Sequence, residues 1–201
     1  DGLNIATLMS HLASADEDVP QNAQQRAAFA ALAGWTGARR MSLANSAGIC
    51  LGPDYHFDLT RPGLALYGGV PRGEAAGHIA PVAHPQAQVI QRRRIKAGDS
   101  VGYNATFTAE RALELAILNI GYADGYLRGF SNRGSAGGGR FPVIGRVSMD
   151  LIAIAVDADP GIAEGDWIAL DYALPEASAQ SGLAQYELLT TLGHRFDRVW
   201  M

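Results

Sequence analysis

The sequence predicts an α/β segment followed by a mainly β segment, and three observations support this fold class. Up to about residue 70, short apolar runs that end in polar residues alternate with a helical stretch. From about Ala80, many short apolar runs are separated by turns rich in Gly and Asp. Between these two regions Pro71, Gly73 and Gly77 interrupt the hydrophobic periodicity, so we expect the boundary between residues 70 and 82.

Length and composition limit the classes of protein. A chain of 201 residues can bury a core as one domain or as two. Its net charge of −4 argues against a nucleic-acid partner, which usually requires a basic surface. No apolar run approaches the roughly 20 residues of a membrane span, so we expect no membrane partner. Cys50 is the single cysteine, which excludes a disulfide framework and predicts a cytoplasmic protein.

The N-terminal elements have the order strand, helix, strand, turn, strand. The expected elements are a strand at 5–12, a helix at 20–35, a strand at 40–44, a tight turn at 45–48 and a strand at 60–67. The first run is almost continuously apolar, as buried parallel strands are. Pro20 suits a first helical turn, and Gly37 ends the helix. This order predicts a parallel sheet or part of a (β/α) barrel.

Polar residues follow three of these apolar runs. His11, Ser46 and Arg61 would lie at the C-terminal rim of a barrel, where barrel sites form. The hydroxyl and amides at Ser46 can hold a phosphate, and Gly63 lets the backbone approach an anion. The alternatives are a serine that caps its own turn and an arginine in a surface ion pair.

The C-terminal region reads as a small β-barrel or sandwich with one late helix. Strands are expected at 87–96, 113–120, 141–147, 151–156, 167–170 and 199–200, and a helix at 182–192.

Three polar groups stand out in this region. Tyr103 lies in a glycine-flanked turn and is either a core aromatic or a proton carrier. The second group is 121–126, with Arg128 beyond it, and the third is 145–150. Tyrosines beside glycines can reach a ligand from a loop tip, whereas the alternative for Tyr122 and Tyr126 is a half-buried anchor.

Seven motifs together resemble the C-terminal portion of the pyridoxal-phosphate-dependent alanine racemases. They are 10–17, 44–47, 61–68, 101–107, 120–125, 145–150 and 186–189, in the order and spacing of that family. The resemblance implies that residues 1–75 are the last strands and helices of a (β/α)8 barrel that binds the cofactor. Residues 76–201 would be a mainly β domain that carries the catalytic tyrosine. The family works as a head-to-tail homodimer whose active site is shared between the subunits.

The reaction that the resemblance implies interconverts L-alanine and D-alanine for peptidoglycan synthesis, with pyridoxal 5'-phosphate as cofactor and no metal. A lysine serves one face of the substrate Cα, and a tyrosine of the other subunit, matched by Tyr103, serves the opposite face. Because an unperturbed phenol has a pKa of about 10, it needs help as a base near neutral pH. His11 matches a histidine that gives this help; the alternative is a satisfied histidine of the barrel core.

The remaining matches concern the cofactor, the substrate and the entrance. Arg61 matches an arginine that faces the pyridine nitrogen; because arginine stays protonated, it leaves this nitrogen as an acceptor only. The family's phosphate cradle is matched by Ser46, by the backbone of Gly63 and Leu64, and by Tyr186. Its substrate carboxylate site is matched by the Met149 N–H and Tyr122, and its entrance is matched by Arg128 and Arg146. Positive charge at an entrance attracts a carboxylate. Without the resemblance, Tyr186 reads as an aromatic packed on its helix.

Two departures from the family pattern bear on function. The cofactor lysine has no counterpart, because the single lysine, Lys96, directly precedes the Tyr103 turn. We therefore expect a fragment, a proteolysis product or one piece of a split protein that lacks the N-terminal half of the barrel and is inactive alone. Ser42 stands where many members have a histidine that supports the pyridine-facing arginine, so this support is an open question.

Three alternatives remain. A racemase for another small amino acid such as serine would differ in the size of its pocket. A non-catalytic module for dimerisation or binding would explain the missing lysine. A decarboxylase of related architecture is disfavoured by the motifs at 101–107 and 148–150.

Overall fold

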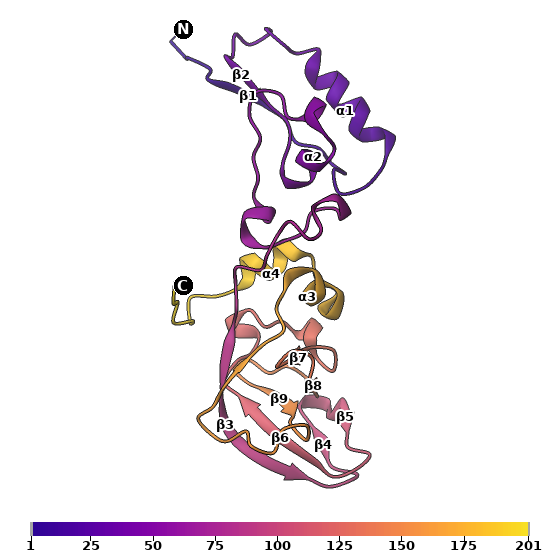
Figure 1. The fold of residues 1–201 in the computed structure, drawn as a ribbon, viewed down its shortest axis with the longest axis vertical. Helices are drawn as coiled ribbons and strands as arrows, with labels where there is room; N and C mark the ends of the chain where they lie inside the picture. Colours follow the sequence, from indigo (N-terminus) through magenta and orange to yellow (C-terminus); the bar gives the residue numbers. More distant parts are fainter. Residues whose placement is uncertain (1, 201) are drawn as a thin grey trace. The chain divides into compact units, whose positions relative to one another are not determined.

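The computed structural model describes residues 2–200, which divide into two compact units, Asp1–Ala80 and Pro81–Met201. The first unit is α/β and the second is mainly β, which confirms the predicted fold class. Figure 1 shows the elements of each unit along the chain. Within the described residues, no helix is both long enough and apolar enough for a transmembrane span.

The first unit contains a parallel strand pair. Its elements are β1 (Thr7–Met9), α1 (Pro20–Ala30), β2 (Arg40–Ser42), α2 (Ser46–Cys50) and the 3₁₀ helices η1 (Pro53–Tyr55), η2 (Leu64–Tyr67) and η3 (Gly73–Ala75). β1 pairs with β2 in parallel, and α1 lies between them in sequence, as expected for a β-α-β unit. The pairing is continued by a parallel bridge between Asn45 and Arg61.

The core of the first unit lies between this strand pair and α1. Leu12, Phe29 and Leu43 are buried in one cluster. Phe29, on α1, packs edge-on against Phe57 at 5.1 Å between ring centres. Burial of each large apolar side chain contributes about 1.5–3 kcal/mol. This packing fixes β1 and β2, and with them the polar residues that follow each strand.

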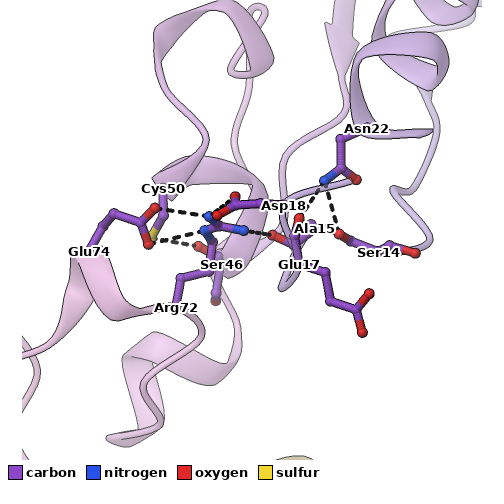
Figure 2. Close-up of polar contacts among 9 residues, drawn as sticks. All are labelled: Ser14, Ala15, Glu17, Asp18, Asn22, Ser46, Cys50, Arg72 and Glu74. Atoms are coloured by element: carbon purple, nitrogen blue, oxygen red, sulfur yellow. Dashed lines mark hydrogen bonds and ion pairs between the residues drawn. The ribbon is translucent and has the colours of Figure 1, made fainter. Parts of the chain in front are cut away.

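Arg72 is a buried cation that ties the chain after η2 to the loop after β1 (Figure 2). Its guanidinium donates to the Ala15 carbonyl at 3.0 Å, to the Glu74 carboxylate at 2.9 Å and to Asp18. Hydrogen bonds from Arg72 lower the pKa of Glu74. Burial, and next the charge of Glu74, raise the pKa of the nearby Cys50 thiol. The contacts of Arg72 with Ala15 and Asp18 therefore anchor the C-terminal part of the loop that begins at His11.

Two predictions for the first unit are wrong. The expected strand at 60–67 is the bridge residue Arg61 followed by η2, because Pro62 lacks an N–H for a strand ladder. The expected turn at 45–48 begins α2 instead. Asn45 caps this helix, since its Oδ1 accepts from the Gly48 N–H at 2.8 Å.

The second unit is built on a six-stranded antiparallel sheet with the order β10-β3-β6-β9-β8-β7. Its strands are β3 (Gln86–Ile95), β6 (Leu113–Leu118), β7 (Ser135–Ala136), β8 (Phe141–Ile144), β9 (Ile152–Ala155) and β10 (Trp167–Ala169), beside a separate hairpin of β4 (Ser100–Val101) and β5 (Phe107–Thr108). A bridge from Ala136 to Leu170 joins the two edges of the sheet. The sheet therefore closes on itself, as expected of a small barrel.

Central strand β6 carries much of the apolar core of the second unit. Leu115 and Leu118 of β6 are buried with Val89 of β3 and Ile154 of β9. The long curved β3 and β6 are prominent in Figure 1. These strands form because apolar and polar residues alternate along them where one face of the sheet is exposed. Where both faces of the sheet are covered, the apolar residues run continuously. The predicted strands at 87–96, 113–120 and 151–156 match β3, β6 and β9 within a few residues.

Helices and aromatic rings cover one end of this unit. The helical elements are α3 (Leu174–Ser181), α4 (Gln185–Thr191) and the 3₁₀ helices η4 (Tyr103–Ala105), η5 (Tyr122–Asp124) and η6 (Arg128–Phe130). Tyr126 stacks on Phe130 at 4.2 Å, and Tyr172 donates to the Leu188 carbonyl of α4 at 3.0 Å. The predicted late helix matches α4, whereas α3 was not predicted. The predicted strand at 199–200 is wrong, because these residues form no ladder.

Candidate active site

Arg61 is the best-anchored site residue of the first unit. Its Nη1 donates to the Ser42 hydroxyl at 2.6 Å, and its Nη2 donates to the Ser10 carbonyl at 2.8 Å. Ser42 is fully buried and itself donates to the Leu59 carbonyl at 2.6 Å. Ser42 therefore supports Arg61 directly, which answers the question raised by the serine at this position. Within the described chain, the Nε–H of Arg61 has no hydrogen-bond partner.

His11 lies between Arg61 and Asn45. Its Nδ1 is 3.4 Å from Arg61 Nη2, and its Nε2 is 3.4 Å from Asn45 Nδ2. A neutral imidazole has one acceptor nitrogen, so only one of these contacts is a hydrogen bond in a given tautomer. His11 is exposed in this chain, so it is not part of the buried core of the first unit.

Ser46 organises the backbone at the start of η2. Its side chain is buried, and its hydroxyl accepts from the N–H of Gly63 at 2.9 Å and of Ala65 at 3.2 Å. Leu64 lies between these two amides and is buried. The predicted cradle residues Ser46, Gly63 and Leu64 therefore meet in one place, beside the capped start of α2.

In the second unit, Tyr103 projects from a turn with an unusual backbone. Gly102, Asn104 and Ala105 all have positive φ, at 79°, 61° and 48°. For residues with a Cβ, such a conformation is sparsely populated and clusters at functional sites. The Tyr103 side chain is 65 % exposed, and its hydroxyl has no partner among residues 2–200. It is therefore not a core aromatic of this unit.

The Tyr103 turn packs directly against segment 145–150. A Cβ on Gly102 would lie 2.7 Å from the Arg146 nitrogen, and a Cβ on Gly145 would lie 2.7 Å from the Val101 oxygen. Such close approaches require that both positions lack a Cβ, as Gly102 and Gly145 do. Asn132 reinforces it, because its Oδ1 accepts from the Gly145 N–H at 2.6 Å and its Nδ2 donates to the Thr106 carbonyl at 3.2 Å.

The Tyr122 turn packs against the same segment. A Cβ on Gly121 would lie 2.4 Å from the carbonyl oxygens of Ser148 and Met149. The amide of Tyr122 donates to the Ser148 carbonyl at 3.0 Å, and the amide of Ala123 donates to that of Met149 at 3.0 Å. The Arg128 guanidinium lies 4.8 Å from the centre of the Tyr122 ring. Arg128 and Tyr122 thus form a cation–π pair beside the loop.

Loop 148–151 presents backbone donors outward. The Ser148 N–H donates to the Leu151 carbonyl at 3.0 Å and closes the loop. Within the chain that the structure describes, the N–H of Met149 has no partner, and the Met149 side chain is exposed. Arg146 is partly exposed on the same segment. An N–H without a partner among the described residues, on a segment that carries Arg146 and packs against the turn of the Tyr122–Arg128 pair, suits an anionic ligand.

Two further tyrosines differ in their surroundings. Tyr186 lies on α4 and is half-exposed, so it is not packed entirely on an apolar helix face. Tyr126 is almost completely buried, and burial raises its pKa strongly. A phenol in that environment stays protonated, so Tyr126 is a core residue and not a proton carrier.

The predicted residues thus form two groups, one in each unit. The first unit brings together His11, Ser46, Arg61, Gly63 and Leu64, and the second unit brings together the Tyr103, Tyr122 and Met149 segments. Sequence reasoning missed the contacts that hold the second group, which come from Asn132 and from the pairing of Arg195 with Asp124 and Asp150. Asp124 and Asp150 lie within the motifs at 120–125 and 145–150, but nothing in the sequence pairs them with Arg195. No cluster of three His, Cys, Asp or Glu able to bind a metal occurs in the described residues.

Comparison with known families places both units. Residues 1–71 match the family model described as alanine racemase, N-terminal domain. Residues 82–200 match the model described as alanine racemase, C-terminal domain. The second match alone covers more than half of the chain.

Curated relatives and solved structures agree. The chain is 45 % identical over 99 % of its length to the alanine racemase of Acidiphilium cryptum, covering 57 % of that protein. It is also 45 % identical over 98 % of its length to the catabolic alanine racemase of Mesorhizobium japonicum, covering 54 % of it.

Among crystal structures, the alanine racemase of Bartonella henselae with covalently bound pyridoxal phosphate gives a TM-score of 0.88 at 38 % identity. It covers 98 % of this chain and 57 % of that one. The biosynthetic alanine racemase of Pseudomonas aeruginosa gives 0.88 at 35 % identity, covering 100 % and 58 %. The chain therefore spans little more than half the length of the relatives it matches.

Proposed function

The chain belongs to the alanine racemase family, and we propose that the complete protein interconverts L-alanine and D-alanine with pyridoxal 5'-phosphate. In this proposal residues 1–75 are the C-terminal part of the cofactor-binding barrel, and residues 76–201 are the β domain with the tyrosine base. The protein would act in the cytoplasm as a head-to-tail homodimer, supplying D-alanine for peptidoglycan. The observation that carries the proposal is the convergence of the Tyr103, Tyr122 and Met149 segments through Gly102, Gly121 and Gly145.

The residues of the first unit fit pyridoxal phosphate. The Arg61 Nε–H, left over after Nη1 and Nη2 are engaged, suits the single lone pair of a pyridine nitrogen. Ser46, whose hydroxyl holds the amides of Gly63 and Ala65, would face the phosphate together with the backbone of Gly63 and Leu64. Tyr186 of the second unit would be a further donor. When bound, the cofactor makes the Cα–H of an amino acid acidic enough to be removed.

The bases act from opposite faces of the substrate. Tyr103 would take or return the Cα proton at its phenolic oxygen on one face, with His11 assisting the transfer. Tyr103 is exposed and its hydroxyl has no partner in the part of the chain that the structure describes, which leaves it available for this task. The other face requires a lysine, which we assign to the part of the relatives that this chain does not span, because Lys96 lies beside the Tyr103 turn. This chain would supply one of the two bases.

Orientation of the substrate would come from the second unit. The Met149 N–H would donate to the substrate carboxylate, with Tyr122 beside it. Arg128 and Arg146 would attract the carboxylate at the entrance. Because Arg61 stays protonated, it would leave the ring nitrogen of the cofactor unprotonated, which would limit side reactions such as transamination.

A racemisation assay on the full-length protein tests this function. With pyridoxal phosphate present, we expect conversion of each alanine enantiomer into the other and much slower conversion of serine. We expect no turnover from the 201-residue chain alone, because it lacks the lysine. A full-length protein that racemised serine better than alanine, or neither, would contradict the proposal.

Ser46→Ala should weaken cofactor binding by about 10- to 100-fold, since it frees two amides that the hydroxyl now holds in place. Fluorescence titration of the full-length apoprotein with pyridoxal phosphate measures this. Ser181→Ala is the matched control, because Ser181 is also buried and its hydroxyl donates to the Ala177 carbonyl in the other unit.

The control should lose a similar amount of stability but bind the cofactor with unchanged affinity. If both variants bound the cofactor with equal affinity, the role of Ser46 would be contradicted.

A further inference from the structure

Arg195 lies where three segments of the second unit meet. It follows α4, and its guanidinium is placed between two carboxylates. Nη1 donates to Asp150 Oδ1 at 2.7 Å, and Nε lies 3.2 Å from Asp124 Oδ1. The arginine thereby joins turn 121–125, loop 148–151 and the chain after α4.

Asp124 needs this cation because its carboxylate is buried. It is 8 % exposed at the side chain, and its second oxygen, Oδ2, accepts from the Gly121 N–H at 2.9 Å. Its carbonyl accepts from the Gly193 N–H at 3.1 Å. A buried carboxylate without a partner is costly, so the turn that carries Tyr122 depends on Arg195 for its conformation.

Asp150 connects Arg195 with the carboxylate-binding amide. It directly follows Met149, whose N–H has no partner in the described residues. The preceding carbonyls, those of Ser148 and Met149, are already held by the Tyr122 turn at 3.0 Å each. Arg195 adds a side-chain link between the same turn and the loop, through Asp124 and Asp150. Loop 148–151 is therefore held by backbone bonds and by an ion pair, while the Met149 N–H has no partner in the described residues.

We propose that Arg195 is a positioning residue for the substrate carboxylate, acting through Asp150 on the Met149 N–H and through Asp124 on Tyr122. This inference rests on the proposed function of the Met149 loop. Arg195 itself does not contact the substrate. Its loss should therefore weaken recognition of the carboxylate while leaving the bases and the cofactor site in place.

The test compares Arg195→Gln with wild type in the full-length enzyme loaded with cofactor. We expect KM for alanine and the inhibition constant of propionate each to rise about tenfold, with kcat within about threefold of wild type. Propionate is alanine without its amino group, so it reports on the carboxylate site alone. The visible absorbance of the bound cofactor should be unchanged. Arg111→Gln is the matched control, because Arg111 also pairs with an aspartate, Asp157, at 3.5 Å on the same unit.

Two further variants separate positioning from general stability. In Asp150→Asn, KM should rise by no more than in Arg195→Gln, because Arg195 keeps its contact with Asp124. Adding Asp150→Asn to Arg195→Gln should change KM by less than about twofold, since Arg195→Gln already removes the Asp150 contact. Arg195→Lys keeps a positive charge for Asp124 but cannot span both carboxylates, so it should show the KM effect even if Arg195→Gln fails to fold.

The outcomes are distinct. An active wild type whose Arg195 variants keep normal KM and propionate affinity, even with a lower melting temperature, overturns this inference alone. Additive effects of the Arg195 and Asp150 changes also overturn it. A wild type without racemase activity overturns the proposed function, and this inference with it.

Discussion

Replacing Tyr103 by phenylalanine in the full-length protein is expected to reduce racemisation in both directions by about 10²- to 10⁴-fold, the usual contribution of a general acid–base. The change removes one exposed hydroxyl that has no partner in the described part of the chain, so the fold should be unaffected. In deuterated water, one enantiomer should still exchange its Cα hydrogen without inversion, because the lysine continues to serve its own face. Polarimetry and proton NMR measure the two effects.

Tyr55→Phe is the control for Tyr103→Phe. Tyr55 is a partly buried tyrosine of the other unit whose ring lies 5.4 Å from the Arg26 guanidinium, a contact that phenylalanine keeps. Its kinetics should equal those of the wild type. If Tyr103→Phe also racemised alanine near the normal rate, Tyr103 would not be the second base.

Gly121→Ala should destabilise the second unit and disturb loop 148–151. Gly121 is extended, with φ of −159°, so alanine meets no conformational barrier there. The added Cβ would instead lie 2.4 Å from two carbonyl oxygens and force the Tyr122 turn away from loop 148–151. Overpacking and the loss of two backbone hydrogen bonds together should cost about 3 kcal/mol. KM for alanine should rise as well, because the Met149 amide loses its support.

Gly161→Ala provides the comparison for Gly121→Ala. A Cβ there approaches only the Asp159 carboxylate, at 3.2 Å, which can move aside. Thermal unfolding of the full-length proteins should show a marked drop for Gly121→Ala and little change for Gly161→Ala. Equal melting temperatures would mean that the close packing at Gly121 does not restrain the loop.

Sequence reasoning found the strands that are specified locally and missed those that depend on distant partners. β3 and β6 could be predicted because their apolar patterns extend over six residues or more. Val199 and Trp200 have high strand propensity, yet they are exposed and unpaired, because propensity forms a strand only beside a partner. α3 was not predicted because it is only eight residues long, too short to show a clear helical period in the sequence.

The residues of the candidate site also fall into a group that the sequence predicts and a group that it does not. The residues with a chemical task lie in recognisable motifs and could be named in advance. The residues that position them could not, because Arg195 and Asp150 are 45 positions apart. The sequence shows that serine replaces the histidine of many family members at position 42, but it does not show whether this serine supports Arg61. Because the serine side chain is short, only the fold shows that Arg61 reaches it, at 2.6 Å. Positive φ at Ala105 likewise has no signature in the sequence, whereas asparagine at 104 is a residue that favours it.

The glycine contacts around segment 145–150 also define what protein engineering can change. Gly102, Gly121 and Gly145 set how closely three backbones approach, so randomising them would scramble the geometry before any new specificity appeared. Tyr122, whose side chain extends from the loop, can be varied without touching those contacts. A library that seeks a larger amino-acid substrate should therefore diversify Tyr122 and keep the three glycines invariant.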